Sequence, residues 1–287
     1  MELITSPHNP RLKWAAALRD ARHRKREHRL LIDGWDMIQR AVDAGLQCTE
    51  LFLNSDSLSP QLESKLSALA KLCPGLQPIG VAPTALRKLQ YGEREETAIA
   101  VAIPPDTSLD GLTHRIQTTS PNHSPTPPTP TPRELFLVLD RMEKPGNLGA
   151  ILRSADAAGA TAVLLSDPVC EVWNPNAIRS SLGTLFHVPI ALGTEAEVLQ
   201  WLKQRSAALF AARADGGTQY HRIVYPDRTA LVIGSEALGL EDRWRGPSIQ
   251  SVHIPMHGKI DSLNASVSGS VLLFEVARQR LATPHDP

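Results

Sequence analysis

The sequence predicts an α/β protein with a small N-terminal domain and a larger C-terminal domain built on a parallel sheet. Short apolar segments alternate with amphipathic ones along most of the 287 residues, as strands alternate with helices in a layered fold. Residues 135–139 and 230–234 are almost continuously apolar, which is typical of strands buried on both faces of a parallel sheet. Six of the twelve residues from 121 to 132 are proline, so we expect an extended linker between the two domains.

The N-terminal domain, residues 1–103, is expected to be a small α/β layer. Asn9-Pro10 precedes a helical pattern over residues 11–28, because proline is favoured in the first turn of a helix. Gly45 ends the next helix, as glycine commonly does. Strands are expected at 30–32, 51–53, 79–81 and 98–103, and further helices at 35–44, 61–72 and 84–89.

The linker is expected at residues 104–133, and the C-terminal domain at 134–287. The apolar strand 134–139 leads this domain, and the helix 147–158 ends at Gly159. Regular alternation of the two element types continues to the end of the chain, which favours a parallel sheet. Strands are expected at 162–165, 188–191, 207–211, 229–233 and 251–254, and helices at 177–182, 195–204 and 263–281.

Composition limits the possible functions. Hydrophobic residues make up 42% and charged residues 21% of the chain, as in ordinary globular proteins. Aromatic residues are only 5%, which argues against a stacking platform for single strands. The three cysteines form no CxxC or Cys/His pattern, so no zinc site is indicated and a reducing compartment is expected. The sequence contains no apolar stretch of membrane-spanning length, and we expect a cytoplasmic protein without a bound metal.

Positive charge is concentrated near the N-terminus. Residues 11–29 contain eight Lys or Arg and two acidic residues, a net charge of +6 on a chain whose total formal charge is zero. Such a cluster is typical of a surface that faces a polyanion. A solvated, charged helix face explains an isolated run of this kind equally well.

The usual phosphate-binding motifs are missing. Residues 140–145 follow the first strand of the C-terminal domain without a GxGxxG pattern, and the chain contains no GxxxxGK[ST] sequence. A conventional dinucleotide fold, a class-I methyltransferase and a P-loop enzyme are therefore excluded. A cofactor, if one is bound, must be held in another way.

Three segments combine a polar turn with a strand end or a helix start: residues 144–153 (KPGNLGAILR), 231–240 (LVIGSEALGL) and 254–267 (IPMHGKIDSLNASV). Such turns offer main-chain groups to a ligand. In this order they resemble the three signature motifs of the SpoU (TrmH-like) RNA 2′-O-methyltransferases, a branch of the SPOUT superfamily. The resemblance covers residues 134–282. It implies a SPOUT domain with a C-terminal trefoil knot, S-adenosylmethionine as cofactor, an RNA substrate and a homodimer.

The resemblance also implies which residues bind the cofactor. Main-chain atoms of Gly234, Ile254 and Leu263 occupy the corresponding positions of the second and third motifs. Singly, these residues are better explained as a turn glycine and two core side chains. Their order and spacing within the motifs favour cofactor binding.

The catalytic residues implied by the resemblance are Asn147, Arg153, Glu236, Ser262 and Asn264. Each has a structural alternative: Asn147, Ser262 and Asn264 are also suited to capping helices, Glu236 to a first helical turn, and Arg153 to pairing with Asp156. A guanidinium does not readily lose its proton. We therefore interpret Arg153 as a clamp that orients the ribose 2′-hydroxyl and stabilises its developing negative charge, and not as a general base.

The N-terminal domain resembles the substrate-binding module often fused to this catalytic domain, which is similar to the ribosomal L7Ae/L30 fold. This resemblance is looser, since Asp33-Gly34 replaces the usual Glu-Gly and the acidic run 92–97 departs from a glycine-containing turn. It implies RNA contacts, mostly to phosphate. The candidate RNA-binding residues are Lys13, Arg22, Arg24, Arg26 and, in the C-terminal domain, Arg179, for which a structural salt bridge is an equal alternative.

The expected function is S-adenosylmethionine-dependent methylation of an RNA ribose. Ribosomal RNA is the first choice of substrate and tRNA the second, with no DNA or membrane partner expected. A non-catalytic RNA-binding assembly factor and a methyltransferase that confers antibiotic resistance are alternatives. The sequence leaves open which nucleotide is modified and whether Arg153 serves its own site or that of a second subunit.

Overall fold

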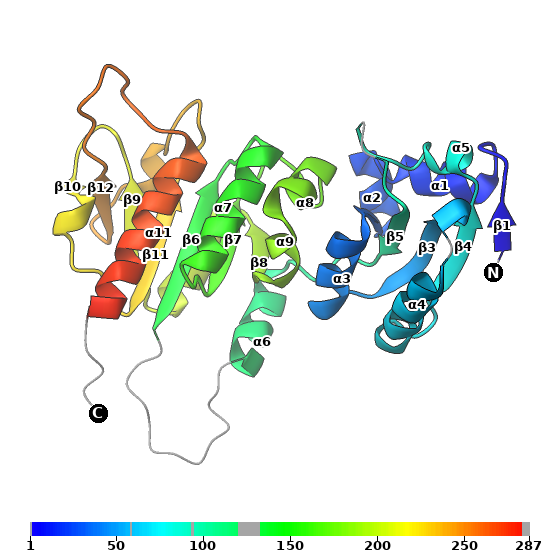
Figure 1. Ribbon diagram of the computed structural model, residues 1–287. Coiled ribbons are helices and arrows are strands. Elements are labelled where there is room, and N and C mark those ends of the chain that lie inside the picture. The colour runs from blue at the N-terminus through cyan, green and yellow to red at the C-terminus, as the bar shows by residue number, and fades with distance from the viewer. Residues whose placement is uncertain (1, 58, 93–94, 120–132, 283–287) are drawn as a thin grey trace, which may run out of the picture. The chain divides into compact units, whose positions relative to one another are not determined.

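The computed structural model describes residues 2–57, 59–92, 95–119 and 133–282. The chain forms two compact units (Figure 1). The first comprises residues 1–105 and 173–187, and the second comprises residues 106–172 and 188–287. Residues 173–187 thus group with the first unit although they follow the proline-rich segment in the sequence.

The first unit contains a mixed sheet of five described strands in the order β1-β4-β3-β5-β2. β5 runs antiparallel to β3 and β2, whereas β1, β4 and β3 are parallel. Phe52, Ile79 and Ile99 lie in its core and are almost fully buried. The strands are β1 (Glu2–Ile4), β2 (Leu30–Asp33), β3 (Cys48–Asn54), β4 (Gln77–Val81) and β5 (Ala98–Ala102). The helices are α1 (Pro10–Ala17), α2 (Ala21–Glu27), α3 (Trp35–Asp43), α4 (Pro60–Leu72), α5 (Pro83–Leu86), α8 (Pro175–Ser181) and α9 (Thr184–His187).

The prediction of one helix over residues 11–28 was wrong. The chain leaves α1 after Ala17 and starts α2 at Ala21. The carboxylate of Asp20 accepts hydrogen bonds from the main-chain N–H groups of Arg22 and His23, at 2.8 and 3.3 Å. Aspartate is a preferred N-cap because it satisfies these otherwise unpaired donors. The residues that follow Asp20 are mostly basic. The hydrophobic pattern therefore did not indicate that one helix ends and another begins here.

The second unit contains a sheet of seven described strands in the order β10-β12-β9-β11-β6-β7-β8. Each described pair is parallel, which confirms the predicted parallel sheet. The strands are β6 (Glu134–Asp140), β7 (Ala162–Ser166), β8 (Ile190–Gly193), β9 (Ala208–Ala212), β10 (Thr218–Gln219), β11 (Arg228–Ile233) and β12 (Ile249–His253). The helices are α6 (Leu109–Thr119), α7 (Pro145–Ala157), α10 (Glu195–Gln204) and α11 (Ala265–Ala282).

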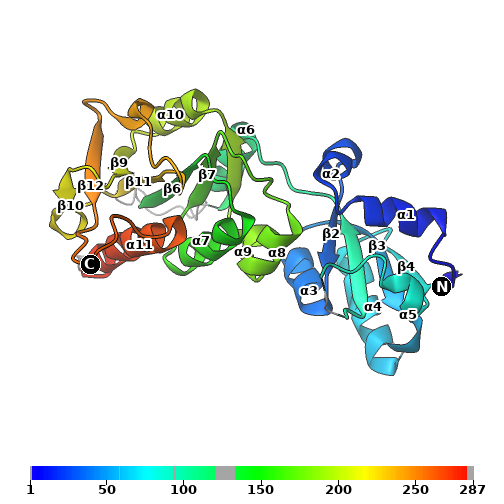
Figure 2. The ribbon, with the colours of Figure 1, turned by 90° about the horizontal axis from the view of Figure 1, so that it is seen from above.

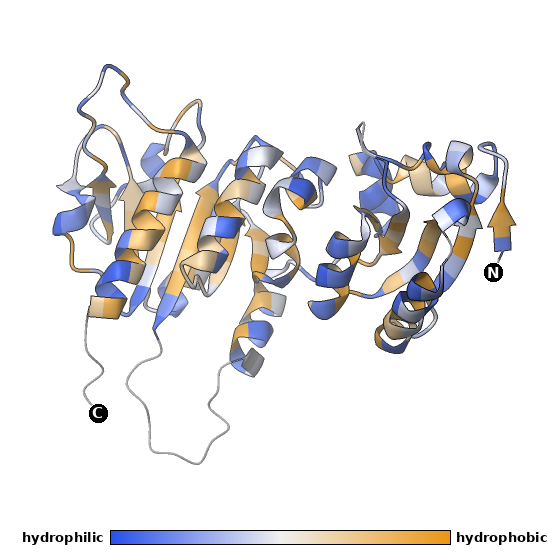
Figure 3. Cartoon of the chain, viewed as in Figure 1, coloured by the Kyte–Doolittle hydropathy of each residue, from blue (hydrophilic) through white to orange (hydrophobic). Residues whose placement is uncertain are grey.

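Helices cover both faces of this sheet. Figure 2 shows α7 and α11 side by side on one face and α6 and α10 on the other. The central strands β6 and β11 are hydrophobic along most of their length (Figure 3), and each residue of β6 is buried. Burial on both faces explains why these strands read as continuous apolar runs.

α6 lies within the segment that the sequence assigned to the linker. Leu112 packs in the core of the second unit, and Nε1 of Trp201 donates to Oγ1 of Thr113 at 2.9 Å. The Arg115 guanidinium donates to the carbonyl of Ile190 at 2.8 Å. Residues 109–119 therefore form a helix and not an extended linker, because their few apolar side chains share one buried face. The proline-rich residues 120–132 lie outside the described residues.

The connections around β6 create a place for a ligand. β6 has β7 on one side and β11 on the other. From β6 the chain first adds β7 and β8 on one side, and it then returns to add β9, β11 and β12 on the other. In open α/β sheets, ligands bind beyond the carboxyl ends of the strands at such a switch. The segments that follow β6 and β11 are the first two motifs. The trefoil knot implied by the resemblance stays a prediction.

Among the described helices, none combines the length and the apolar character needed to cross a membrane.

Candidate active site

A cavity of about 910 Å³ opens at the carboxyl ends of β9, β11 and β12. Its size lies within the range of roughly 300–1,000 Å³ that is usual for small-molecule sites. Gly234, Ile254 and Leu263, the predicted cofactor-binding residues, all line it. The structure thus brings together the turns that follow three separate strands, β9, β11 and β12. The lining consists of residues in the segments 212–215, 233–239, 252–263 and 265–268.

The turn after β11 folds back tightly on Gly234. A Cβ atom at this position would lie 2.3 Å from the carbonyl carbon and oxygen of Gly239 and 2.5 Å from the main-chain nitrogen of Leu240. The Gly239 N–H donates to the carbonyl of Ser235 at 3.0 Å, and the Leu238 N–H donates to Oγ of Ser235 at 3.1 Å. Only glycine fits this close approach of backbone to backbone. The turn therefore presents main-chain groups to the cavity.

Three predicted catalytic residues meet beside this cavity. Nδ2 of Asn147 donates to Oε1 of Glu236, and Nδ2 of Asn264 donates to the same oxygen at 2.9 Å. Nδ2 of Asn264 also lies 3.3 Å from Oδ1 of Asn147. Each residue comes from a different one of the three motifs. Glu236 is therefore the centre of a polar cluster that the whole C-terminal unit must fold to assemble.

Asn264 has two roles in this arrangement. Its Oδ1 accepts hydrogen bonds from the main-chain N–H and the hydroxyl of Ser266, at 2.9 and 2.6 Å, which caps the start of α11. Its Nδ2 faces Glu236. The capping role and a place in the polar cluster, which the sequence left as alternatives, are both present. Ser262 is exposed and lines the cavity, and within the described residues its side chain makes no hydrogen bond.

Asn147 does not cap α7, because the N-cap is Lys144. Lys144 also forms an ion pair with Oε2 of Glu236, and this contact raises the lysine pKa above its ordinary value. Sequence reasoning gave Lys144 no role, although it belongs to the first motif. A lysine at the start of a helix is disfavoured by the positive end of the helix dipole. This unfavourable position is the feature of the sequence that could have indicated a functional role for Lys144.

Arg153 is not part of the cluster in a single chain. It lies on α7, where six residues place it about 120° around the helix axis from Asn147. It is exposed, it does not line the cavity, and it has no hydrogen bond or ion pair to any residue that the structure describes. Its guanidinium is thus available to another molecule.

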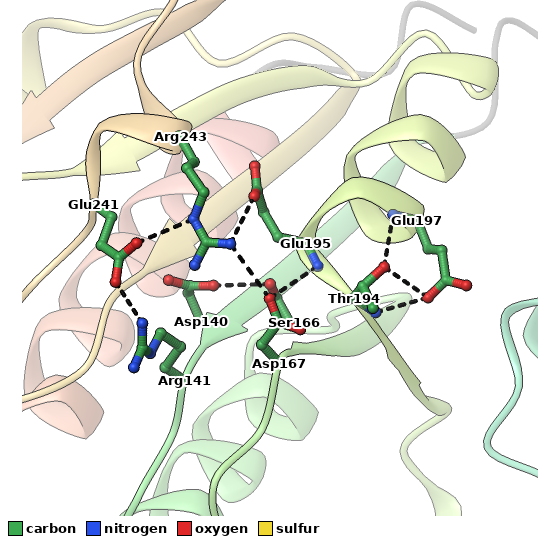
Figure 4. A network of polar contacts seen from close by, with 9 residues as sticks. All are labelled: Asp140, Arg141, Ser166, Asp167, Thr194, Glu195, Glu197, Glu241 and Arg243. Carbon is green, nitrogen blue, oxygen red and sulfur yellow. Dashed lines mark hydrogen bonds and ion pairs between the residues drawn. The ribbon is translucent and has the colours of Figure 1, made fainter.

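An ion network lies at the carboxyl ends of β6, β7 and β8 (Figure 4). The Arg243 guanidinium pairs with Glu241, Glu195 and Asp167 at 3.1, 3.2 and 3.7 Å, and Glu241 also pairs with Arg141. Surface pairs of this kind contribute little singly. Together with the fully buried Trp244, they hold the segment that follows the cavity-lining turn against the sheet.

The basic segment of the first unit is only partly exposed. Lys13, Arg22 and Arg26 are exposed on α1 and α2. Arg24 is only 5% exposed, and its guanidinium donates to the carbonyls of Leu18 and Arg19, both at 2.8 Å. The prediction that Arg24 lies on an RNA-facing surface was wrong. The side chain is buried, and its guanidinium binds main-chain carbonyl groups.

Two further arginines of this segment are engaged within the unit. Arg11 pairs with Glu2 and Glu50, and Arg19 pairs with Asp33. The exposed charge is therefore smaller than the count along the sequence suggests. Arg179, the remaining candidate for RNA binding, is exposed on α8. Among the described residues, no group of three or more His, Cys, Asp or Glu side chains is arranged to hold a metal ion.

Comparison with protein families yields a match to each part of the chain. Residues 134–274 match the SpoU rRNA methylase family, and residues 9–100 match the MRM3-like substrate-binding domain. The first match contains all three motifs around the cavity, and the second contains the basic helices α1 and α2.

Similar proteins cover nearly the whole chain. A 23S rRNA (uridine(2479)-2′-O)-methyltransferase of Streptomyces viridochromogenes is 31% identical over 97% of this chain and 93% of its own length. The 23S rRNA (guanosine(2553)-2′-O)-methyltransferase RlmP of Bacillus subtilis is 24% identical over 96% and 99%. The crystal structure of the SpoU methyltransferase AviRb from Streptomyces viridochromogenes, in complex with the cofactor AdoMet, is similar with a TM-score of 0.82, 28% identity, and coverage of 96% of this chain and 100% of that chain.

Proposed function

The chain belongs to the SpoU rRNA methylase family, and from this premise we propose that it is an S-adenosylmethionine-dependent RNA ribose 2′-O-methyltransferase that acts on ribosomal RNA. The observation that carries this proposal is the meeting of Asn147, Glu236 and Asn264 beside the cavity. Similarity to two 23S rRNA 2′-O-methyltransferases over almost the full chain supports rRNA over tRNA as the substrate.

The cavity fits S-adenosylmethionine in size and in chemistry. Gly234, Ile254 and Leu263 lie in its wall, and the turn at Gly234 leaves no room for a side chain. When bound, the cofactor supplies a methyl group on a sulfonium, which is a good leaving group. The protein's task is then mainly to hold the acceptor hydroxyl in line, near attack distance.

The polar cluster is suited to that task. Glu236 fixes the amides of Asn147 and Asn264 on one carboxylate oxygen, which leaves their orientation defined before RNA arrives. Pre-oriented amides and carboxylates position a ribose hydroxyl at low entropic cost. We assign Ser262, at the cavity wall, to the same positioning role, and Arg153 to stabilising the charge that develops on the 2′-oxygen.

We further propose that the protein is a homodimer that associates through α11 and α7. Val267, Phe274 and Leu281 follow one another at seven-residue intervals on α11 and are 46%, 49% and 87% exposed. A seven-residue apolar spacing is typical of helices that pack against another helix. The hydroxyl of Ser270 on α11 donates to Oγ of Ser154 at 2.7 Å, so α7, the helix that carries Arg153, packs directly against α11. A second copy would cover the stripe and receive Arg153.

Replacement of Phe274 by aspartate is expected to produce a monomer, because a charge would be buried without a partner in the proposed interface. Light scattering coupled to size-exclusion chromatography measures the mass. Leu72→Asp on α4 is the matched control, since Leu72 is 51% exposed and lies in the other unit. A Phe274→Asp protein with the mass of the wild type would refute this interface.

The proposed activity is tested by transfer of labelled methyl from S-adenosylmethionine to separate pools of unmodified rRNA and tRNA. We expect label in rRNA, in an alkali-resistant 2′-O-methyl linkage at one ribose. Label confined to tRNA would refute the choice of substrate. Cofactor and RNA binding without transfer to either pool, or to immature ribosomal particles, would favour a non-catalytic assembly factor. A cytoplasmic location stays a prediction.

A further inference from the structure

Lys144 occupies a position that helix physics disfavours. It is the N-cap of the 13-residue helix α7, and its side chain makes no capping hydrogen bond. Ser, Thr, Asp and Asn are preferred there, and a cation is unfavourable beside the positive end of a helix. A residue type that is unfavourable at its position in a helix, and that makes no compensating hydrogen bond there, is commonly retained because it has a function.

The contacts of Lys144 connect it to the polar cluster. Oε1 of Glu236 is occupied by the amides of Asn147 and Asn264, and Oε2 is paired with the Lys144 ammonium. Within the described part of the chain, Lys144 is the only cation paired with Glu236. An RNA phosphodiester that approached Glu236 alone would be repelled, and the Lys144 ammonium offsets the charge of this carboxylate.

The Lys144 side chain is also free to reach a ligand. It is 67% exposed, and an ammonium has three donors, of which the pair with Glu236 uses one. The contact with Glu236 raises the lysine pKa, so the group stays charged at neutral pH and is unsuited to serve as a base. These properties favour a role in binding an anion.

We propose that Lys144 is an RNA-contacting residue of the active site, whose ammonium neutralises Glu236 and binds the phosphodiester beside the ribose that receives the methyl group. This inference rests on the proposed function, because it takes the Glu236 cluster to be the place of the target ribose. It adds to the motif residues a charged contact that fixes the RNA backbone next to the reacting hydroxyl.

The test uses the full-length protein and three variants: Lys144→Met, Lys144→Arg, and Lys203→Met as a charge-matched control on an exposed face of α10. Binding to an unmodified 23S rRNA transcript is measured at several salt concentrations in the presence of S-adenosylhomocysteine. For Lys144→Met we expect affinity to fall roughly tenfold and the salt dependence to decrease by about one phosphate contact. Lys144→Arg should keep the salt dependence, since a guanidinium also binds phosphate. Lys203→Met should match the wild type.

Two results would overturn the proposal. In the first, Lys144→Met retains the salt dependence of the wild type, and no phosphate contact is lost. In the second, S-adenosylmethionine affinity falls in step with RNA affinity, which would make Lys144 a support for Glu236 and not an RNA contact. The readout is binding, so it stays interpretable if the wild type fails to methylate rRNA. That failure would count against the proposed function and not against Lys144.

Discussion

Replacing Gly234 with alanine is expected to weaken S-adenosylmethionine binding by roughly 100-fold or more, the equivalent of about 2.7 kcal/mol. The added Cβ would lie 2.3 Å from main-chain atoms of Gly239, which cannot move aside as a flexible side chain can. The turn from 234 to 240 must therefore open, and with it the wall of the cavity. Calorimetric titration with the cofactor measures the loss, and thermal unfolding checks that the fold survives.

Gly258→Ala is the matched control for this variant. Gly258 lines the same cavity, but a Cβ there meets no heavy atom within 4 Å. Its cofactor affinity should stay within about twofold of the wild type, a difference of some 0.4 kcal/mol. Equal affinity in Gly234→Ala and Gly258→Ala would mean that the turn after β11 does not form the cofactor site.

The second large effect is expected from Arg153→Ala. Loss of a donor that stabilises developing charge commonly lowers turnover by about 10²–10³-fold. Because Arg153 does not line the cavity, cofactor affinity should be unchanged. Single-turnover methyl transfer with saturating RNA measures the effect. Arg222→Ala, at another exposed arginine, is the control and should retain full activity. Unchanged turnover in Arg153→Ala would remove the catalytic role assigned to this residue.

Mixing two inactive variants extends this experiment to the subunit arrangement. Arg153 has no hydrogen bond or ion pair to Glu236 within the described part of a single chain, so the proposed dimer is expected to supply it from the second copy. In that case, mixed dimers of Arg153→Ala and Glu236→Ala contain one intact site and recover part of the wild-type activity. A mixture that stays inactive, with mixed dimers shown to form, would mean that Arg153 acts on its own chain.

Most strands and helices could be predicted from the sequence, because the distribution of buried and exposed residues along the chain gives them a clear hydrophobic pattern. β6 and β11 are apolar on both faces, and glycines or prolines mark many of the ends. The elements that were missed have weak patterns. β1 has one buried residue out of three. The apolar residues of α6 are few and lie among polar residues, including several threonines.

The candidate site was predicted in part, for a related reason. Motif order located Gly234, Glu236 and Asn264, but spacing along a chain carries no information on which side chain faces which. The hydrogen bonds that Asn147 and Asn264 share on Glu236, and the pair between Lys144 and Glu236, depend on contacts between segments that lie far apart in the sequence. Such contacts exist only after the sheet has formed.

The final helix, α11, connects the polar cluster around Glu236 with the exposed apolar stripe. Asn264 caps α11 and touches Glu236, while the apolar stripe from Val267 to Leu281 runs along the outer face of the same helix. An 18-residue helix is a stiff rod of about 27 Å, so a tilt imposed along the stripe is felt at its capped end. In the proposed dimer, a change in how the two copies meet along the stripe would therefore also displace Asn264, so the interface and the polar cluster would have to evolve together.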